Sequence, residues 1–394
     1  MSLKIKVSKY KMNKINIIRD NDTLKEFYDK CIKEKVLAID TEFIRENTYY
    51  PVLCLVQIAS ETFSAIIDPL SKINMEPIWE LLSNKEILKV FHAGKQDLEI
   101  FFNLTGKIPE PIYDTQVAAM FCGLGDQVSY DALVNKFLGL TLTKESQFSN
   151  WLQRPLTKKQ LQYALLDVEC LIKVFPLIKK ITKDNKREEW VDKEIRYLAN
   201  KELYNINPSE VWQRIKIKNP KRDVLNVLKF LAEWREIECK KRNIPRNKLI
   251  RNEILVNLSQ LKPKDIISIS KIRGIPKTLS KNDLTTILEL IKTSQKIDLN
   301  KWPKIPKHSK KLNVNKEGLD LLKLLLSYCS RESGLAEKLI ANTDELRLIL
   351  DGQKKDLKIF IGWRNEIFGK FVNLLLMGKI GFTIKNNKIK LLEF

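Results

Sequence analysis

The 394-residue sequence has no long apolar run, no Cys-x-x-Cys pair and only two histidines. No stretch approaches the roughly 20 apolar residues that a membrane-spanning helix needs. The charged segment from Met1 to Lys11 has no apolar segment behind it, so we expect no secretory leader. The six cysteines are far apart, which argues against a disulfide framework or a zinc knot. These absences predict a cytoplasmic protein.

Length and charge suggest several domains and a polyanionic partner. A chain of 394 residues is too long for one ordinary domain, and two or three are expected. Residues 1–190 carry 27 Lys and Arg against 25 Asp and Glu, whereas residues 191–394 carry 43 against 23. The basic half favours nucleic acid as a partner, and a merely solvated basic surface is the alternative.

The hydrophobic pattern changes near residue 185. Before it, strand-like runs are followed by strands interleaved with helices, which predicts an α/β sheet covered on both faces. After it, the pattern is helical, with a Pro- and Lys-rich linker and a hairpin near the end. The expected strands are 36–41, 53–59, 63–68, 88–92 and 112–114; the expected helices include 75–82, 97–102, 116–121, 130–138, 158–181 and 221–242; the linker is 298–315 and the hairpin 381–392.

Four acidic residues and a tyrosine form the candidate site. Asp40 and Glu42 lie two apart at a strand end, so their side chains share a face of the sheet. Tyr163 and Asp167 lie four apart in a helical segment and share one face of that helix. Asp97 stands near a helix start, where a carboxylate is tolerated. Each residue alone has an ordinary structural explanation, but together they can converge on one metal site.

The order and neighbours of these residues resemble the DEDD superfamily of 3′→5′ exonucleases. Asp-Thr-Glu-Phe at 40–43 is similar to its first motif, His92-Ala93 through Asp97 to its second, and Tyr163-x-x-x-Asp167 to its third. One branch of the superfamily carries His five residues before the last Asp, where this chain has Gln162. The chain therefore resembles the tyrosine-type branch.

Further segments resemble the ribonuclease D family within that branch. These are Arg45, 48–51, 53–59, 113–115 and 139–156 in the first half. In the second half, 234–236, 242–247 and 273–275 resemble the HRDC domain, and 363–369 more loosely resemble the closing domain of the family. The resemblance implies a ribonuclease H-like mixed sheet with flanking helices, followed by all-α HRDC-like domains. It divides the chain into an exonuclease domain (1–190), an HRDC domain (210–296), a basic linker (297–315) and a second HRDC-like domain (316–394).

The resemblance also implies a two-metal hydrolysis of phosphodiesters at an RNA 3′ end. Asp40, Glu42, Asp97 and Asp167 would be the metal ligands, and oxygen ligands favour Mg²⁺ or Mn²⁺. An unperturbed phenol has a pKa near ~10, so Tyr163 is a poor base at neutral pH. We expect it to orient the attacking water instead.

Several residues are candidates for contacts with nucleic acid. Phe43 and His92 could line the pocket for the terminal nucleotide, although His92 could equally be a buried structural histidine. Lys144 and Arg154 could contact phosphates or simply be solvated. In the HRDC-like domain the candidates are Arg242, Arg246, Lys248 and Arg251.

The predicted function is therefore a 3′→5′ exoribonuclease that releases nucleoside 5′-monophosphates, with trimming of tRNA precursors implied by the family. Two alternatives stay open at this point. One is a DNA exonuclease with the same chemistry, and the other is a catalytically silent RNA-binding protein. No obligate protein partner is evident from the sequence.

Overall fold

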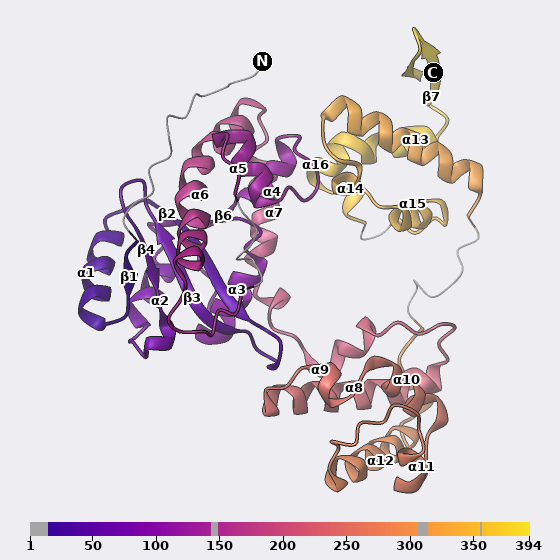
Figure 1. The fold of residues 1–394 in the computed structure, drawn as a ribbon. Helices are drawn as coiled ribbons and strands as arrows, with labels where there is room; N and C mark the ends of the chain where they lie inside the picture. Colours follow the sequence, from indigo (N-terminus) through magenta and orange to yellow (C-terminus); the bar gives the residue numbers. More distant parts are fainter. Residues whose placement is uncertain (1–14, 143–148, 306–313, 355–356) are drawn as a thin grey trace.

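The computed structural model describes residues 15–142, 149–305, 314–354 and 357–394. Its first part is built on a six-stranded mixed sheet with strand order β1-β4-β3-β2-β5-β6 (Figure 1). The strands are β1 (Ile17–Ile18), β2 (Val36–Ile44), β3 (Val52–Ala59), β4 (Ser64–Ile67), β5 (Leu88–Phe91) and β6 (Ile112–Asp114). The expected α/β class is confirmed, and β1 is an addition to the five predicted strands.

The strand pairing places the sequence-distant motifs beside one another. Strands β2, β3 and β4 form an antiparallel meander, while β5 pairs parallel to β2 and β6 parallel to β5. The helices of this part are α1 (Asn21–Cys31), α2 (Glu76–Ser83), α3 (Lys95–Thr105), α4 (Thr115–Phe121), α5 (Tyr130–Leu138), α6 (Lys158–Asp184) and α7 (Glu188–Leu198).

Helix α6 covers one face of the sheet and contacts β2, β3, β4 and β5. The helix begins with a capping box in which the Thr157 hydroxyl and the Gln160 side chain satisfy each other's backbone amides. Leu55 of β3 and Ile66 of β4 pack against Leu165 of α6. Alternate residues of the strands join the main core with α1, α2 and α3 instead, so both faces are covered.

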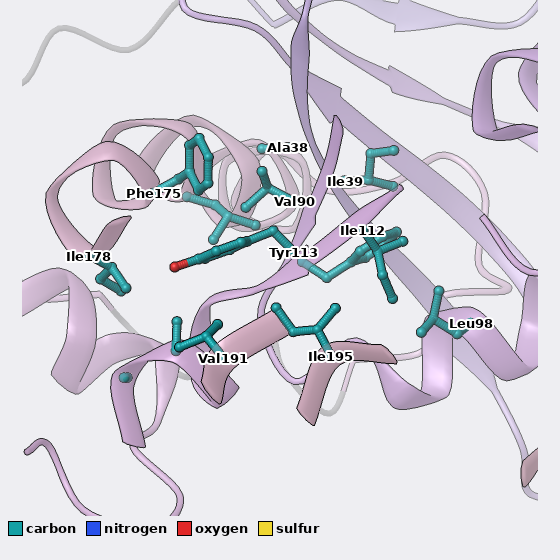
Figure 2. Packing of buried hydrophobic residues seen from close by; sticks show 14 of the residues in the cluster. Ala38, Ile39, Val90, Leu98, Ile112, Tyr113, Phe175, Ile178, Val191 and Ile195 are labelled. Carbon is teal, nitrogen blue, oxygen red and sulfur yellow. The ribbon is translucent and has the colours of Figure 1, made fainter. Parts of the chain in front are cut away.

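The main core continues past the sheet into α6 and α7. Figure 2 shows Tyr113 of β6 reaching between Phe175 and Ile178 of α6 and Val191 of α7. The Tyr113 and Phe175 rings meet edge to face with centroids 5.0 Å apart. Helix α7 thereby becomes part of the exonuclease core and offers its other side to the C-terminal segment.

The second part is a separate helical cluster with its own hydrophobic core. It contains a 3₁₀ segment (Pro208–Arg214), α8 (Arg222–Arg242), α9 (Arg246–Leu249), α10 (Asn252–Leu261), α11 (Ile266–Ser270) and α12 (Lys281–Gln295). Helix α8 packs against the 3₁₀ segment, α10 and α12. The predicted helix at 221–242 is present. Gly274, before α12, has a φ of 86°, a left-handed backbone conformation that favours glycine.

The third part is helical and ends in a hairpin. It comprises α13 (Lys316–Ser333), α14 (Glu337–Ile340), α15 (Thr343–Leu350), α16 (Gly362–Arg364), a π-helical turn (Asn365–Gly369), α17 (Lys370–Leu376), β7 (Ile380–Lys385) and β8 (Lys388–Glu393). The hairpin confirms the prediction at 381–392. Much of the predicted linker, residues 306–313, lies outside the described residues.

The third part is docked on the exonuclease domain through α7. Trp363 stacks on Trp190 with ring centroids 5.8 Å apart, and its indole N–H donates to Glu194 at 3.0 Å. Arg364 donates to the same carboxylate at 2.6 Å. The segment 363–369 therefore anchors the C-terminal part to the catalytic part. No helix among the described residues is long and apolar enough to cross a membrane.

Candidate active site

Three of the predicted carboxylates meet where β2 and α6 face each other. One oxygen from each of Asp40, Glu42 and Asp167 lies within 4.8 Å of the others. Asp40 and Glu42 are alternate residues of β2 and share one face, while α6 packs across that strand and brings Asp167 over it. The expected convergence of the strand pair with the helix is therefore present in the structure.

Asp97 reaches the cluster from the first turn of α3. It is 7% exposed, and its Oδ1 accepts a short hydrogen bond from the hydroxyl of Thr41, the residue between Asp40 and Glu42. The charge of Asp97 acts on Asp40, although its oxygens are not among the three that gather within 4.8 Å. Thr41 thus links the second acidic motif to the first.

A turn held by Asp114 positions Asp97. The Asp114 carboxylate accepts hydrogen bonds from the backbone N–H groups of Ala93, at 3.3 Å, and Gly94, at 2.8 Å, just before α3. It also caps the start of α4. Glycine is required at 94, because a Cβ there would lie 2.6 Å from the Cβ of Phe91.

The pKa of each of the four carboxyl groups is raised above its ordinary value. Burial and the charges of Asp97 and Asp167 raise the pKa of Asp40 well above its usual value. Burial, then the charge of Asp40, raises the pKa of Glu42 to about 10. Burial also raises the pKa of Asp97 to about 7 and that of Asp167 to about 8, against opposing hydrogen bonds from Thr41 and Tyr163 respectively.

This donor set fits divalent cations. Buried carboxylates that repel one another are stabilised by a positive charge between them, and hard oxygen ligands suit Mg²⁺ or Mn²⁺. A metal of this kind would favour the charged carboxylates and so displace the protons that burial favours. The arrangement can therefore hold cations beside a phosphodiester, which is the chemistry expected from the sequence.

Tyr163 stands one helical turn before Asp167 and hydrogen-bonds its carboxylate. Burial and the nearby negative charges of Asp167, Glu42 and Asp40 raise the pKa of Tyr163 above its ordinary value of 10. The phenol therefore stays protonated at neutral pH and can donate a hydrogen bond, but it cannot act as a general base. Its ring lies against Trp151, with centroids 6.3 Å apart.

The two candidates for base contact are partly or fully used by the fold. The His92 ring nitrogens lie 3.0 Å from the Thr115 hydroxyl and 3.2 Å from the Val128 carbonyl, and burial lowers the pKa of His92. The geometry is that of a satisfied structural histidine. Phe43 is half-buried and packs against the main core.

Arg154, one of the two cationic candidates in the exonuclease domain, is ion-paired within the fold. The Arg154 guanidinium binds both oxygens of Asp68, at 2.8 and 2.7 Å, and donates to the carbonyls of Trp151, Gln153 and Cys54. It ties the segment before α6 to β3 and to the end of β4. Arg154 therefore has a structural role in this part of the chain. Lys144 lies outside the described residues.

Two candidates of the second part are also held by carboxylates. Arg242 binds Asp283 and Glu238, with nearest distances of 2.5 and 2.7 Å. Arg246 binds the buried Glu236 at 2.5 Å. Both arginines stabilise the helical cluster in this arrangement. Arg251 is exposed at the start of α10.

Arg246 also belongs to the contact between the exonuclease domain and the helical cluster. It donates to the Tyr49 hydroxyl at 3.0 Å and lies 5.0 Å from the ring centroid. The backbone N–H groups of Tyr49 and Tyr50 donate to the Asn243 side chain at 3.0 and 3.1 Å. The loop that joins β2 to β3 is therefore bound to the end of α8.

Sequence reasoning missed the residues that support the acids. Thr41 lies within the first motif, but its side chain alternates to the other face of β2 and its partner Asp97 is 56 positions away. Asp114 has one local signal, an acidic residue between a strand and a helix, which is typical of an N-cap. The backbone groups that it holds at 93 and 94 become visible only in the folded chain.

Comparisons with known proteins agree with this site. Residues 15–183 match the family model of a 3′-5′ exonuclease and residues 224–291 that of the HRDC domain. The fold and the carboxylate cluster thus define a 3′-5′ exonuclease domain joined to an HRDC domain.

Relatives that match nearly the whole chain identify its family within this class of exonucleases. The chain is 40% identical over 380 residues to ribonuclease D of Sphingobium indicum, covering 95% of this chain and 98% of that protein. It is 41% identical over 379 residues to ribonuclease D of Zymomonas mobilis, covering 95% and 97%. It is similar in structure to Escherichia coli RNase D, with a TM-score of 0.80 and 26% identity over 93% of this chain and 99% of that one. The chain belongs to the ribonuclease D family.

Proposed function

We propose that this chain is a 3′→5′ exoribonuclease that shortens tRNA precursors from their 3′ ends, releasing nucleoside 5′-monophosphates. The observation that carries the proposal is the cluster of the partly buried Asp40 and Glu42 with the buried Asp167, in a chain of the ribonuclease D family. The E. coli relative is described as an exoribonuclease involved in structured RNA processing, which supports RNA over DNA as the substrate. The HRDC match of residues 224–291 adds to this support.

The proposed catalytic residues are Asp40, Glu42, Asp97, Tyr163 and Asp167. Asp40, Glu42 and Asp167 would hold one divalent cation, with Asp40 also facing a second that Asp97 holds directly or through water. When bound, such cations make a water nucleophilic at neutral pH and stabilise the leaving 3′ oxygen. The chain's own task is to hold the ligands at the end of β2 and to orient the substrate.

Tyr163 supplies orientation rather than basicity. Its protonated hydroxyl donates to Asp167 and can donate to the water that attacks the phosphorus. Thr41 donates a hydrogen bond to Oδ1 of Asp97 and so holds that carboxylate beside β2. Mg²⁺ and Mn²⁺ are the proposed metals because every ligand is a carboxylate.

The basic half would supply affinity for the RNA backbone. Residues 191–394 carry 43 Lys and Arg against 23 Asp and Glu. Arg251, exposed at the start of α10, is one contact to test. The chain functions in the cytoplasm, and its working parts are the four predicted from the sequence: 1–190, 210–296, the linker 297–315 and 316–394.

The test uses the full chain with a 3′-extended tRNA and with single-stranded DNA of matched length, each in Mg²⁺ or Mn²⁺. We expect stepwise shortening of the RNA and mononucleotide products, with Asp40→Ala inactive. Equal or faster digestion of the DNA would favour the DNA exonuclease alternative. No digestion of either substrate would contradict the enzymatic function.

A second measurement separates binding from chemistry. Binding of the RNA to the Asp40→Ala protein is titrated against salt, with and without Arg251→Ala. Loss of one phosphate contact lowers the slope of log K against log salt by ~0.7 for a single strand. An unchanged slope would remove Arg251 from the RNA surface while leaving the catalytic assignment intact.

A further inference from the structure

Gln57 is a fully buried polar residue in the centre of the sheet. It lies in β3 and its exposed fraction is 0%. Within the described residues, neither its Oε1 nor its Nε2 has a hydrogen-bond partner. An amide buried in this way is unfavourable, and a leucine or methionine of similar size would avoid the cost. The Gln57 amide therefore has a donor and an acceptor that this arrangement of the described residues does not use.

The strand register places that amide beside the metal ligands. Gln57 pairs directly with Asp40 across the antiparallel β2–β3 ladder, so the two side chains lie on the same face of the sheet. Across to β4 its neighbour on that face is Ile66, and along β3 the neighbours are Leu55 and Ala59. Among these four positions, Asp40 alone has a polar side chain.

Helix α6 closes this face from above. It contacts both β2 and β3, and it carries Asp167 to the Asp40 cluster. Two residues further along α6, the Glu169 carboxylate accepts a hydrogen bond from Ser64 of β4 at 2.7 Å, which shows that this helix lies over the same face of the sheet. Gln57 thus lies in a closed layer between the sheet and α6, beside the carboxylates.

We propose that Gln57 is a positioning residue for the metal site: its carboxamide hydrogen-bonds Asp40, directly or through one enclosed water, when the site is loaded with divalent cations. The inference rests on the proposed role of Asp40 as a metal ligand. A ligating carboxylate works best when its remaining lone pairs are held by a neighbouring donor, which fixes its rotamer. The Nε2 of Gln57 is such a donor, and its Oε1 can accept from a water in the same layer.

The test compares Gln57→Leu with wild type in the full chain. Calorimetric titration with Mn²⁺, without substrate, measures the dissociation constant, and thermal unfolding in a chelator reports folding. We expect Gln57→Leu to weaken Mn²⁺ binding by about 10–100-fold, the usual effect of losing an outer hydrogen bond to a ligand. Its thermal stability in the chelator should equal or exceed that of wild type, because the unpartnered amide is gone.

Two further variants sharpen the comparison. Gln57→Met is unbranched and of similar length, so it replaces the leucine variant if that one fails to fold. Ser64→Ala removes a polar group on the same face, whose partner Glu169 is not one of the proposed metal ligands, and should leave the Mn²⁺ affinity unchanged. A merely structural role for Gln57 would lower stability and leave Mn²⁺ affinity untouched.

The Asp40→Ala protein distinguishes a failure of the Gln57 role from a failure of the proposed metal site. If it loses Mn²⁺ binding while Gln57→Leu and Gln57→Met both bind as wild type does, the positioning role is overturned and the metal site stands. If Asp40→Ala binds Mn²⁺ normally, the proposed metal site itself is wrong. In exonuclease assays, the Mn²⁺ concentration for half-maximal activity of Gln57→Leu should rise by the same 10–100-fold, with turnover recovering at saturating metal.

Discussion

The metal-free protein should become less stable as the pH rises, and Asp97→Asn should weaken that dependence. In the folded chain the pKa of Asp97 is raised from 3.8 to about 7, and that of Asp167 from 3.8 to about 8. A carboxyl with a raised folded-state pKa contributes its stability in full below the unfolded pKa, near 4, and loses it as the pH rises toward the folded value. Both groups therefore favour acidic conditions.

The pH dependence of the free energy of unfolding is set by the number of protons that only the folded state retains. Each carboxyl that is protonated only in the folded state lowers the free energy of unfolding by ~1.4 kcal/mol per pH unit. Near pH 5 to 6, below both folded pKa values, Asp97 and Asp167 together contribute a slope of about −3 kcal/mol per unit, which becomes shallower toward pH 7 as Asp97 loses its proton. Asp97→Asn removes one of them, so its slope should be shallower by ~1.4 kcal/mol per unit.

The assay is thermal or urea unfolding in a chelator from pH 5 to pH 7. Asparagine keeps an oxygen that can accept the Thr41 hydrogen bond, so the variant tests the charge rather than the contact. The stability of Asp97→Asn relative to wild type should rise by about 2 kcal/mol over this range, or roughly 4–8 °C in Tm. Glu61→Gln, at an exposed carboxyl in the turn after β3, is the matched control. Parallel curves for wild type and Asp97→Asn would refute the reasoning.

Three further results are expected. Tyr163→Phe should lose most of its turnover even at saturating Mn²⁺ while still binding the metal, because the hydroxyl orients water and is not a ligand; near-normal turnover would contradict the assignment. Gly94→Ala should cost about 1–3 kcal/mol in urea unfolding, since its Cβ would lie 2.6 Å from that of Phe91; unchanged stability would show that the turn can relax. Trp363→Ala, at a side chain 2% exposed, should cost ~3–5 kcal/mol. Met377→Ala, at a side chain 66% exposed, is its control and should be close to neutral in the same measurement.

Much of the sheet and the acidic constellation could be predicted because their signals are local. Strand alternation places Asp40 and Glu42 on one face, and helical spacing does the same for Tyr163 and Asp167. The structure then brings Asp167 to the β2 pair as the sequence predicts. Strand β1 escaped prediction because it is two residues long and pairs only at the sheet edge.

The contacts that the sequence did not predict are those with residues far away in the chain. Arg154 appears cationic and available in the sequence, yet Asp68, 86 positions earlier, binds its guanidinium. Arg242 is bound by Asp283, 41 positions later. Gln57 gives no local signal at all, because its importance depends on which strand pairs with β3. Charge and spacing thus predicted the class of site but not which cations remain free.

The two hydrophobic cores determine which parts of the molecule unfold together. The C-terminal helices belong to the same continuous core as the catalytic sheet, through Trp363, whereas the HRDC helices have a core of their own. Elements that share a core lose their packing together. The exonuclease part and the C-terminal part of the chain therefore form one cooperative unit, and the HRDC domain between them behaves as an insertion that can melt separately. Calorimetry would then show two transitions, and catalysis would follow the one that the outer segments share.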